Sequence, residues 1–376
     1  MAETTHARVL QVLGSSAGGV ARHVAQISRA LAAGGALQSP FQVHVAGPTS
    51  VREVVATEGS GTGFTPVEIS DRPGPGDVAS VRTLRSLARG ADVVHAHGLR
   101  AGALAVLATR GLRGRPAVVV TLHNLPVGSR QVRAVSAVLE RLVSRHADAV
   151  LGVSGDLVEL ARRRGAARTE RALVPAPPRP DVVHSPAQVR ASLGVPSDAR
   201  LLVTVGRLAP QKGLDTLCEA AALLAVTTAP DALVWVVAGD GPLRGQVQER
   251  IDAGSLPVVL LGYREDAPDL MSAADVVVSS AVWEGQPIWL QEALGLGAAI
   301  VATDAGGTRE VTGDAAELVA VGDASALAQR IGALLSDEPR REALERSARA
   351  RAATLPSVAD VVGSLTTLYE AVRLGR

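Results

Sequence analysis

One loop near the middle of the chain carries two cationic side chains in a setting that suits an anion. Arg207 and Lys212 lie in the segment 206–213, between an apolar run at 201–205 and a helical pattern at 214–226. Unpaired N–H groups at a helix start and two positive side chains favour a negative ligand, so the segment predicts a diphosphate site. Lys212 is the only lysine among 38 basic residues, which indicates that its compact ammonium is specifically required. The alternative is an ordinary surface loop with two cations.

Two glutamates and two further glycine-rich turns follow in the same half. Glu284 and Glu292 stand eight residues apart, Glu284 in a loop and Glu292 in a helix that we expect to begin near Pro287. We expect both carboxylates on one face of that helix, where they could accept hydrogen bonds from sugar hydroxyls at two separated points. Glycine-rich turns at 237–242 and 302–310 follow predicted strands and let the backbone approach a ligand. The alternative for the pair is a solvated helix with ordinary glutamates.

Histidines lie at strand ends in the first half of the chain. His95 and His97 belong to the segment 92–97, and His123 follows another apolar run. We expect His95 and His97 to point to opposite faces of their strand, so that at most one reaches a site. His95 is interpreted as a structural histidine with satisfied hydrogen bonds. His123 begins a loop that contains glycine and proline, which favours a role in a site. The role of His23, in the first predicted helix, stays open.

Taken in order, these motifs resemble those of the family 4 retaining glycosyltransferases (GT4), which have the two-Rossmann GT-B fold. They read Gly-Arg-x4-Lys-Gly from position 206, Ala-Gly-x-Gly-Pro from 238, Glu-x7-Glu from 284 and Ala-Thr-Asp-x-Gly-Gly-x-x-Glu from 302. The resemblance spans nearly the whole C-terminal half, and the combination is specific although each piece alone is not. The N-terminal half matches more weakly, through Gly18 and Gly19 in a first glycine loop and through the strand ends at 92–97 and 121–123.

The resemblance implies a role for each matching residue. Arg207 and Lys212 would hold the donor diphosphate and stabilise the departing nucleotide; Glu292 would bind the ribose, and Glu284 the hydroxyls of the donor sugar. His123 would lie near the anomeric centre. The implied donor-binding set is Gly19, Arg207, Lys212, Gly239, Gly262, Tyr263, Arg264, Glu284, Gly285, Gln286, Pro287, Ile288 and Glu292. The implied catalytic set is His123, Glu284, Arg207 and Lys212, and the implied acceptor-binding set is Gly18, His97 and His123. No metal and no other cofactor are expected.

The segment after Glu284 departs from the family pattern and leaves the donor open. Pro287 has no N–H to offer a donor oxygen. Trp283 and Trp289 flank the same segment in a chain with only 2% aromatic residues. They are either core residues or a wall on which a sugar or base stacks. We therefore leave the donor as a UDP- or GDP-linked hexose.

The elements that must position these residues alternate in type along the chain. We expect strands at 8–13, 41–46, 92–95, 117–121, 149–153, 201–205, 233–238, 258–261, 276–279 and 299–302. We expect helices at 20–33, 130–145, 214–226, 243–253, 268–273, 289–296, 324–336, 339–354 and 357–374. Strands that alternate with helices favour parallel sheets, and the uninterrupted apolar runs are typical of strands covered on both faces.

The length of 376 residues suggests two domains, and the proline-rich segment 175–180 suggests a linker between them. We predict an α/β protein of the GT-B type, with two Rossmann-like, doubly wound domains facing a central cleft. Residues 1–178 would form an acceptor-binding domain, with the last helix at 357–376 packing back on it. Residues 179–356 would form the donor-binding domain.

Charge is unevenly distributed between the two halves. Residues 1–178 carry 21 arginines and 12 acidic residues, whereas the rest carries 17 basic and 25 acidic residues. Either two opposed domains attract each other, or the basic half meets an anionic partner such as a phospholipid surface or a phosphorylated acceptor. The helix at 130–145 joins an apolar stripe to several arginines, which fits either a surface helix docked on a sheet or a membrane contact. No nucleic-acid partner is expected.

The remaining bulk properties bear on the compartment. The chain begins without a basic run followed by an apolar core, and its single cysteine, Cys218, excludes an internal disulfide. These features favour the cytoplasm, with the inner face of the membrane as an open possibility. Arginine in place of lysine suggests a GC-rich, actinobacterial source. We expect a retaining, metal-independent glycosyltransferase that moves a hexose to an acceptor hydroxyl. The alternatives are a nucleotide-sugar-binding protein without transfer activity and another GT-B enzyme such as an epimerase.

Overall fold

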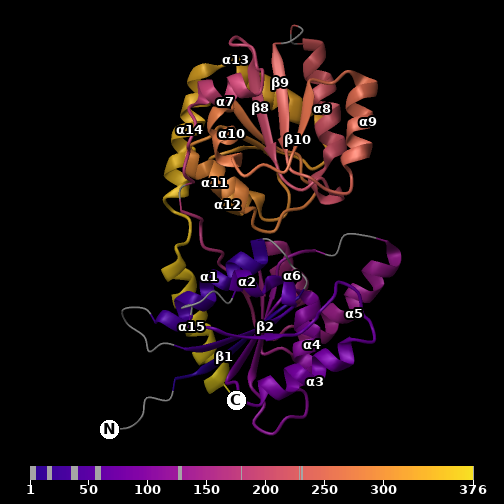
Figure 1. The fold of residues 1–376 in the computed structure, drawn as a ribbon, viewed down its shortest axis with the longest axis vertical. Coiled ribbons are helices and arrows are strands. Elements are labelled where there is room, and N and C mark those ends of the chain that lie inside the picture. The colour runs from indigo at the N-terminus through magenta and orange to yellow at the C-terminus, as the bar shows by residue number, and fades with distance from the viewer. Residues whose placement is uncertain are drawn as a thin grey trace. The chain divides into compact units, whose positions relative to one another are not determined.

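A computed structural model gives the fold (Figure 1). It describes residues 6–14, 19–34, 41–55, 61–125, 129–178, 180–227, 229 and 232–375. The chain divides into two compact units. Unit 1 comprises Met1–Pro175 and Pro356–Arg376, and unit 2 comprises Ala176–Leu355. The last helix of the chain therefore belongs to the first unit.

The described part of unit 1 contains one parallel sheet with the strand order β3-β2-β1-β4-β5-β6-β7. Its strands are β1 (Arg8–Leu13), β2 (Gln42–Gly47), β3 (Gly63–Pro66), β4 (Val93–His97), β5 (Ala117–Leu122), β6 (Ala149–Gly152) and β7 (Thr169–Arg171). Its helices are α1 (Gly19–Ala33), α2 (Arg52–Val55), α3 (Asp77–Ala88), α4 (Leu99–Thr109), α5 (Arg130–His146), α6 (Gly155–Arg163) and α15 (Val358–Leu374), with a 3-10 turn at Thr49–Val51. The order reverses between β1 and β4, which is where ligands bind in doubly wound sheets.

The described part of unit 2 repeats this topology, with the parallel order β10-β9-β8-β11-β12-β13. Its strands are β8 (Arg200–Val205), β9 (Leu233–Ala238), β10 (Val258–Gly262), β11 (Val276–Ser279), β12 (Ile300–Thr303) and β13 (Glu317–Val319). Its helices are α7 (Pro186–Ser192), α8 (Leu214–Thr227), α9 (Arg244–Gly254), α10 (Ala267–Ala273), α11 (Ile288–Leu296), α12 (Thr308–Thr312), α13 (Ala324–Ser336) and α14 (Glu338–Ala352), with a 3-10 turn at Pro210–Lys212. The reversal here lies between β8 and β11.

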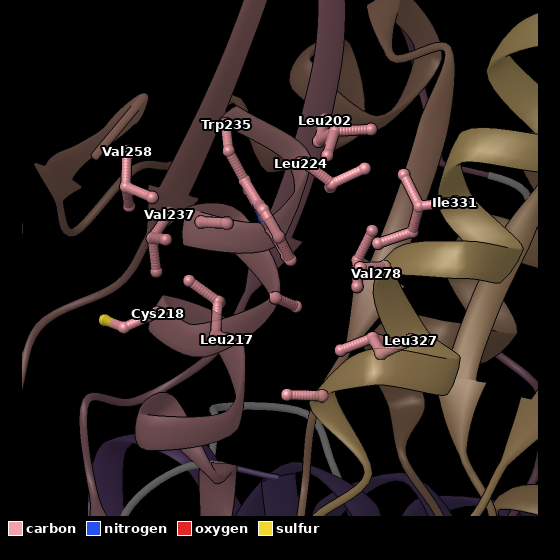
Figure 2. Close-up of a cluster of buried hydrophobic side chains, with 14 of the residues drawn as sticks. Leu202, Leu217, Cys218, Leu224, Trp235, Val237, Val258, Val278, Leu327 and Ile331 are labelled. Carbon is pink, nitrogen blue, oxygen red and sulfur yellow. The ribbon is translucent and has the colours of Figure 1, made fainter. Parts of the chain in front are cut away.

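The sheet of unit 2 is buried on both faces. On one face, Leu202 of β8, Trp235 of β9 and Val278 of β11 pack in one cluster with Leu217 of α8 and Leu327 of α13 (Figure 2). Alternate residues of the same strands belong to a second buried cluster, formed with α7, α10, α11 and α14. Coverage of both faces explains why these strands read as uninterrupted apolar runs.

Most predicted elements match the structure closely. The predicted strands at 8–13, 233–238 and 276–279 have the observed bounds, and the predicted α/β class with two doubly wound sheets is confirmed. The sequence does not predict the edge strands β3, β7 and β13, because each is short and at most one of its side chains is buried. These segments are strands because each pairs with a longer neighbouring strand, and no local pattern predicts that pairing.

Candidate functional site

The loops that follow β8, β9 and β10 in unit 2 are hydrogen-bonded to one another. The N–H of Leu208 donates to the carbonyl of Asp240 at 3.0 Å. The N–H of Gly239 donates to the carbonyl of Gly262 at 2.7 Å. A side chain on Gly239 would overlap the carbonyl of Gly206, so the first two loops touch through their glycines. Three of the predicted segments therefore meet at the carboxyl edge of one sheet.

The loops after β11 and β12 continue this arrangement on the other side of β8. The N–H of Val282 donates to the carbonyl of Gln211 at 2.9 Å, and the N–H of Gly307 donates to the carbonyl of Glu284 at 2.8 Å. The backbone around Glu284 is therefore bonded to the loop after β8 and to the loop after β12. These hydrogen bonds place the segment that contains Glu284 beside the predicted diphosphate segment 206–213.

An ion pair joins the two segments. The Nζ of Lys212 lies 2.5 Å from Oε1 of Glu284, and the two side chains are only 17% and 10% exposed. The hydroxyl of Ser280 donates to the backbone carbonyl of Lys212 at 2.9 Å. Gly213 adopts φ +60°, and a Cβ there would overlap the Ser280 carbonyl, so glycine is required for this approach. The only lysine of the chain is thus held by two loops and directed at a carboxylate.

The two glutamates of the predicted pair lie in the elements that the sequence predicts for them. Glu284 lies in the loop before α11, which begins at Ile288. Glu292 is half-buried in the second turn of α11. The loop position of Glu284, the helical position of Glu292 and the helix start near Pro287 are therefore confirmed, whereas the shared face of the two carboxylates stays a prediction. Between them, Gly285 and Pro287 are buried, whereas Gln286 is half-buried.

The remaining predicted donor residues of unit 2 differ in their surroundings. Arg207 is exposed directly after β8. Arg264 donates two hydrogen bonds to Asp266, at 2.7 and 2.5 Å, and these lower the pKa of the Asp266 carboxyl. Tyr263 is 72% exposed and follows Gly262, which has φ +73°. The exposed ring of Tyr263 is therefore the flat surface that this segment offers, while the Arg264 guanidinium is engaged by a carboxylate.

The two tryptophans near Glu284 have different positions. Trp289 packs against the buried cluster of unit 2 that contains α10 and α11, which supports the core interpretation for this residue. Its indole Nε1 is buried and has no hydrogen-bond partner among the described residues. Trp283 is half-buried, and its indole lies where a Cβ on Gly306 would contact it. Only Trp283 therefore borders the loop cluster through its side chain.

In unit 1, four histidines gather near the ends of β4 and β5. The rings of His95 and His97 are tilted by 33° with centroids 4.3 Å apart, and those of His97 and His123 are stacked at 5.4 Å. His23 of α1 lies edge-on to His97 and His123, at 6.1 and 5.9 Å. The expectation that His95 and His97 point to opposite faces is wrong, because residues two apart on a strand share a face.

Burial keeps this histidine cluster uncharged. It lowers the pKa of His23 to about 4 and, with a smaller contribution from the charge of His23, that of His95 to about 3. Burial first and the neighbouring histidines second hold the pKa of His97 and His123 well below the usual value. Among the described residues, no group of three or more His, Cys, Asp or Glu side chains is arranged to hold a metal ion.

Two residues of the cluster were not found from the sequence. Gln11 of β1 bonds to His97, and Tyr369 of α15 bonds to His95, at 2.8 and 2.7 Å. His95 also bonds to Thr121 at 2.7 Å, which confirms its interpretation as a satisfied structural histidine. No local signal identifies Gln11, which lies in an apolar strand. For Tyr369, its rarity in a chain with two tyrosines was the available signal.

The predicted glycine loop of unit 1 is only partly described. Gly19 is exposed at the start of α1, whereas Gly18 lies outside the described residues. The predicted contact of Gly18 with the acceptor therefore stays a prediction. His97 and His123, the other predicted acceptor contacts, are joined by a hydrogen bond of 3.2 Å between Nδ1 and Nε2.

The helix α5 presents part of its apolar stripe to solvent. Val132, Val135 and Val138 are 40%, 44% and 64% exposed. The buried face instead carries Glu140, which accepts a hydrogen bond from Arg164 at 2.8 Å. The same buried face carries Val143, which lies beside Gly102 of α4. Within the described ranges, no helix is both long enough and apolar enough to cross a membrane.

Comparison with known proteins gives a consistent family assignment. Residues 187–351 match the family described as Glycosyl transferases group 1, and residues 18–177 match the Glycosyl transferase 4-like domain. A phosphatidyl-myo-inositol mannosyltransferase of Mycolicibacterium smegmatis is 30% identical over 346 residues, which cover 86% of this chain and 83% of that enzyme. An Escherichia coli UDP-Gal:alpha-D-GlcNAc-diphosphoundecaprenol alpha-1,3-galactosyltransferase is 26% identical over 57% of this chain. The chain spans 58% of that enzyme, and 30% and 55% of relatives from Bacillus subtilis and Rhizobium meliloti.

Solved structures share the fold of the whole chain. Anabaena Alr3699/HepE in complex with UDP-glucose has a TM-score of 0.76 at 20% identity, over 97% of this chain and all of that one. WaaG, a glycosyltransferase involved in lipopolysaccharide biosynthesis, has a TM-score of 0.71 at 19% identity, over 97% of this chain and 99% of that one. These similarities confirm the predicted GT-B fold.

Proposed function

Because the chain belongs to the glycosyl transferases group 1 family, the GT4 glycosyltransferases, we propose that it transfers a hexose from a nucleotide-diphosphate sugar to an acceptor hydroxyl. The proposed transfer retains the anomeric configuration and needs no metal ion. The ion pair between Lys212 and Glu284 carries the proposal. It places a cation suited to phosphate beside a carboxylate suited to sugar hydroxyls, at the carboxyl edge of a doubly wound sheet.

The proposed donor site uses the loops of unit 2. Arg207 and Lys212 bind the diphosphate and stabilise the negative charge that develops on the leaving nucleotide. Glu284 accepts hydrogen bonds from hydroxyls of the donor sugar, and Glu292 binds the ribose. The exposed ring of Tyr263 stacks on the base. Gly239, Gly262 and the segment 285–288 line the same site through their backbone.

The proposed reaction makes and breaks bonds on one face of the sugar. The acceptor oxygen bonds to the anomeric carbon while the bond from that carbon to the donor phosphate oxygen breaks. The acceptor proton passes to the departing diphosphate, which lies on the same face, so the configuration is retained. His123 contacts a hydroxyl of the sugar as this exchange occurs. His97, Gly18 and Gly19 belong to the proposed acceptor side.

The proposal is tested first through donor binding. UDP and GDP are the predicted donor nucleotides, and the structural neighbours bound to UDP and UDP-glucose support starting with uridine. A thermal-shift panel of UDP, GDP and ADP should show stabilisation by at least one of the first two. Stabilisation by none of the three would contradict the donor site. Mass spectrometry of products from a donor-by-acceptor panel then separates a transferase from a protein that only binds nucleotide sugars.

The phosphate role of Lys212 is tested by Lys212→Ala. Because the substitution removes a charge-assisted contact to the leaving group, we expect kcat/KM for the donor to fall roughly 100- to 1000-fold. The matched control is Arg250→Ala, which also removes a cation paired with carboxylates, Asp215 and Glu219, on the outer helices of unit 2. Equal donor hydrolysis in wild type and Lys212→Ala would remove the proposed role.

We also propose that α5 makes a peripheral contact with an anionic membrane surface, at the inner face of the membrane. Its exposed stripe of Val132, Val135 and Val138 can enter the headgroup region of a bilayer. The same helix carries exposed arginines at positions 130, 133, 141 and 145. The similarity to a mannosyltransferase named for phosphatidyl-myo-inositol, an anionic lipid, supports the same class of acceptor.

A further inference from the structure

A chain of hydrogen bonds begins at the centre of the sheet in unit 1. The Oγ1 of Thr121 lies 2.7 Å from Nε2 of His95, and Nδ1 of the same ring lies 2.7 Å from the hydroxyl of Tyr369. The amide Nε2 of Gln11 donates to that hydroxyl at 3.3 Å. The four side chains come from β5, β4, α15 and β1, and all four are buried.

The same chain continues from Gln11 to the predicted catalytic histidine. The amide Oε1 of Gln11 lies 2.8 Å from Nε2 of His97. The Nδ1 of His97 lies 3.2 Å from Nε2 of His123. The four side chains between Thr121 and His123 each bond to two members of the set, so the six side chains form an unbranched series.

Neutral imidazoles allow only two proton arrangements along this series. Each ring has one N–H donor and one acceptor nitrogen, and an amide oxygen can only accept. Since Oε1 of Gln11 faces His97, the ring proton of His97 is on Nε2 and its Nδ1 accepts. The proton that His97 accepts comes from Nε2 of His123.

The other end of the series agrees with this direction. The amide nitrogen of Gln11 donates to Tyr369, so the tyrosine proton is directed to Nδ1 of His95. The ring proton of His95 is then on Nε2 and is donated to Thr121. If the Gln11 amide were reversed, every proton in the series would move to the opposite partner. The orientation of one amide therefore selects the tautomer of three histidines.

We propose that Gln11 and Tyr369 are positioning residues that hold His123 as the Nε2–H tautomer and leave its Nδ1 without a proton. The inference rests on the proposed function, in which His123 contacts a sugar hydroxyl. In this tautomer Nδ1 accepts a hydrogen bond from a hydroxyl, whereas the reversed series would present an N–H and favour a phosphate or carbonyl oxygen. The burial that lowers the pKa of all three rings keeps them neutral, as the series requires.

The tautomer can be measured without any substrate. In protein labelled with 15N-histidine, long-range 1H–15N correlation spectra distinguish a protonated from an unprotonated ring nitrogen. Signals are assigned by replacing each histidine in turn. We expect His95, His97 and His123 all to carry the proton on Nε2 between pH 6 and 8. A proton on Nδ1 of His123 in the wild type would overturn the proposal.

The substitution Tyr369→Phe tests the positioning role directly. It removes the hydroxyl that holds the amide nitrogen of Gln11 and keeps the buried ring. The control is Thr366→Val, which removes another buried hydroxyl from α15, one that donates to the carbonyl of Val362 at 2.9 Å. If Gln11 then samples both orientations equally, the Nε2–H tautomer of His123 and kcat both fall about twofold. KM for the donor should not change, and the control should match the wild type.

Two outcomes separate this inference from the proposed function. An unchanged His123 tautomer in Tyr369→Phe would refute the positioning role even if the protein transfers sugar. The expected tautomers with no turnover of any donor would leave the series intact and refute the proposed function instead.

Discussion

Mild acid should destabilise unit 1 and spare unit 2. Unfolding exposes His23 and His95, whose pKa values then return from about 4 and about 3 to 6.5. The unfolded chain therefore binds more protons, and the stability that these histidines contribute above pH 6.5 is lost as the pH falls toward 4. Between pH 7 and pH 5 each of the two costs about 2 kcal/mol, hence ~4 kcal/mol together. His97 and His123 act in the same direction.

The contrast between the units provides an internal reference. All three tryptophans, including Trp235, lie in unit 2, so their fluorescence in a urea titration follows that unit. In unit 2 the pKa values of Asp269 and Asp275 are lowered from 3.8, and such groups lose their stabilising effect only below that value. Hydrogen exchange of peptides from β4 and β5, corrected for the intrinsic effect of pH, follows unit 1.

A single substitution tests the cause. His23→Leu removes a ring whose Nδ1 has no hydrogen-bond partner among the described residues, so it deletes one titrating group without breaking a bond at that atom. The pH dependence of unit 1 stability should weaken by about 1 kcal/mol per pH unit between pH 6 and 5. His146→Gln, at the exposed end of α5, should leave it unchanged. A loss below about 1 kcal/mol in wild-type unit 1 from pH 7 to 5, or an equal loss in both units, would refute the reasoning.

Two further substitutions test the donor loops and α5. Gly213→Ala forces a Cβ against the Ser280 carbonyl at φ +60°, so we expect the urea stability of unit 2 to fall by about 2 kcal/mol or more; Gly245→Ala, in open space on α9, is the control. Val138→Asp should abolish sedimentation with vesicles of phosphatidylglycerol, whereas Val78→Asp, at a 56% exposed site on α3, should not. Equal sedimentation of both variants and wild type, or none by wild type, would contradict the membrane contact.

Local sequence was sufficient for the central strands and for the order of the donor loops. Uninterrupted apolar runs such as 233–238 predicted buried parallel strands, because a strand covered on both faces has no polar side to appear in its pattern. The glycine-rich turns after these strands predicted ligand-binding loops, because glycine lets the backbone approach a ligand. Arg207, Lys212 and Glu284 could therefore be named from the sequence as candidate site residues.

Contacts between distant segments were beyond local pattern. The ion pair of Lys212 with Glu284 joins positions 72 residues apart, and depends on β8 and β11 being neighbours in the sheet. The sheet order is a property of the whole unit, since it depends on which helices cover each face.

The histidine cluster shows most clearly which contacts the sequence could not predict. Its members could be listed from the sequence, but the hydrogen bond between Gln11 and Tyr369 joins residues 358 positions apart. The bond forms because α15 packs against α1 and β5 in unit 1. Burial of the apolar face of α15 favours this packing, and no spacing along the chain predicts it. Residue types thus gave the chemistry available to the protein, and the packing of the last helix gave the direction in which its protons are held.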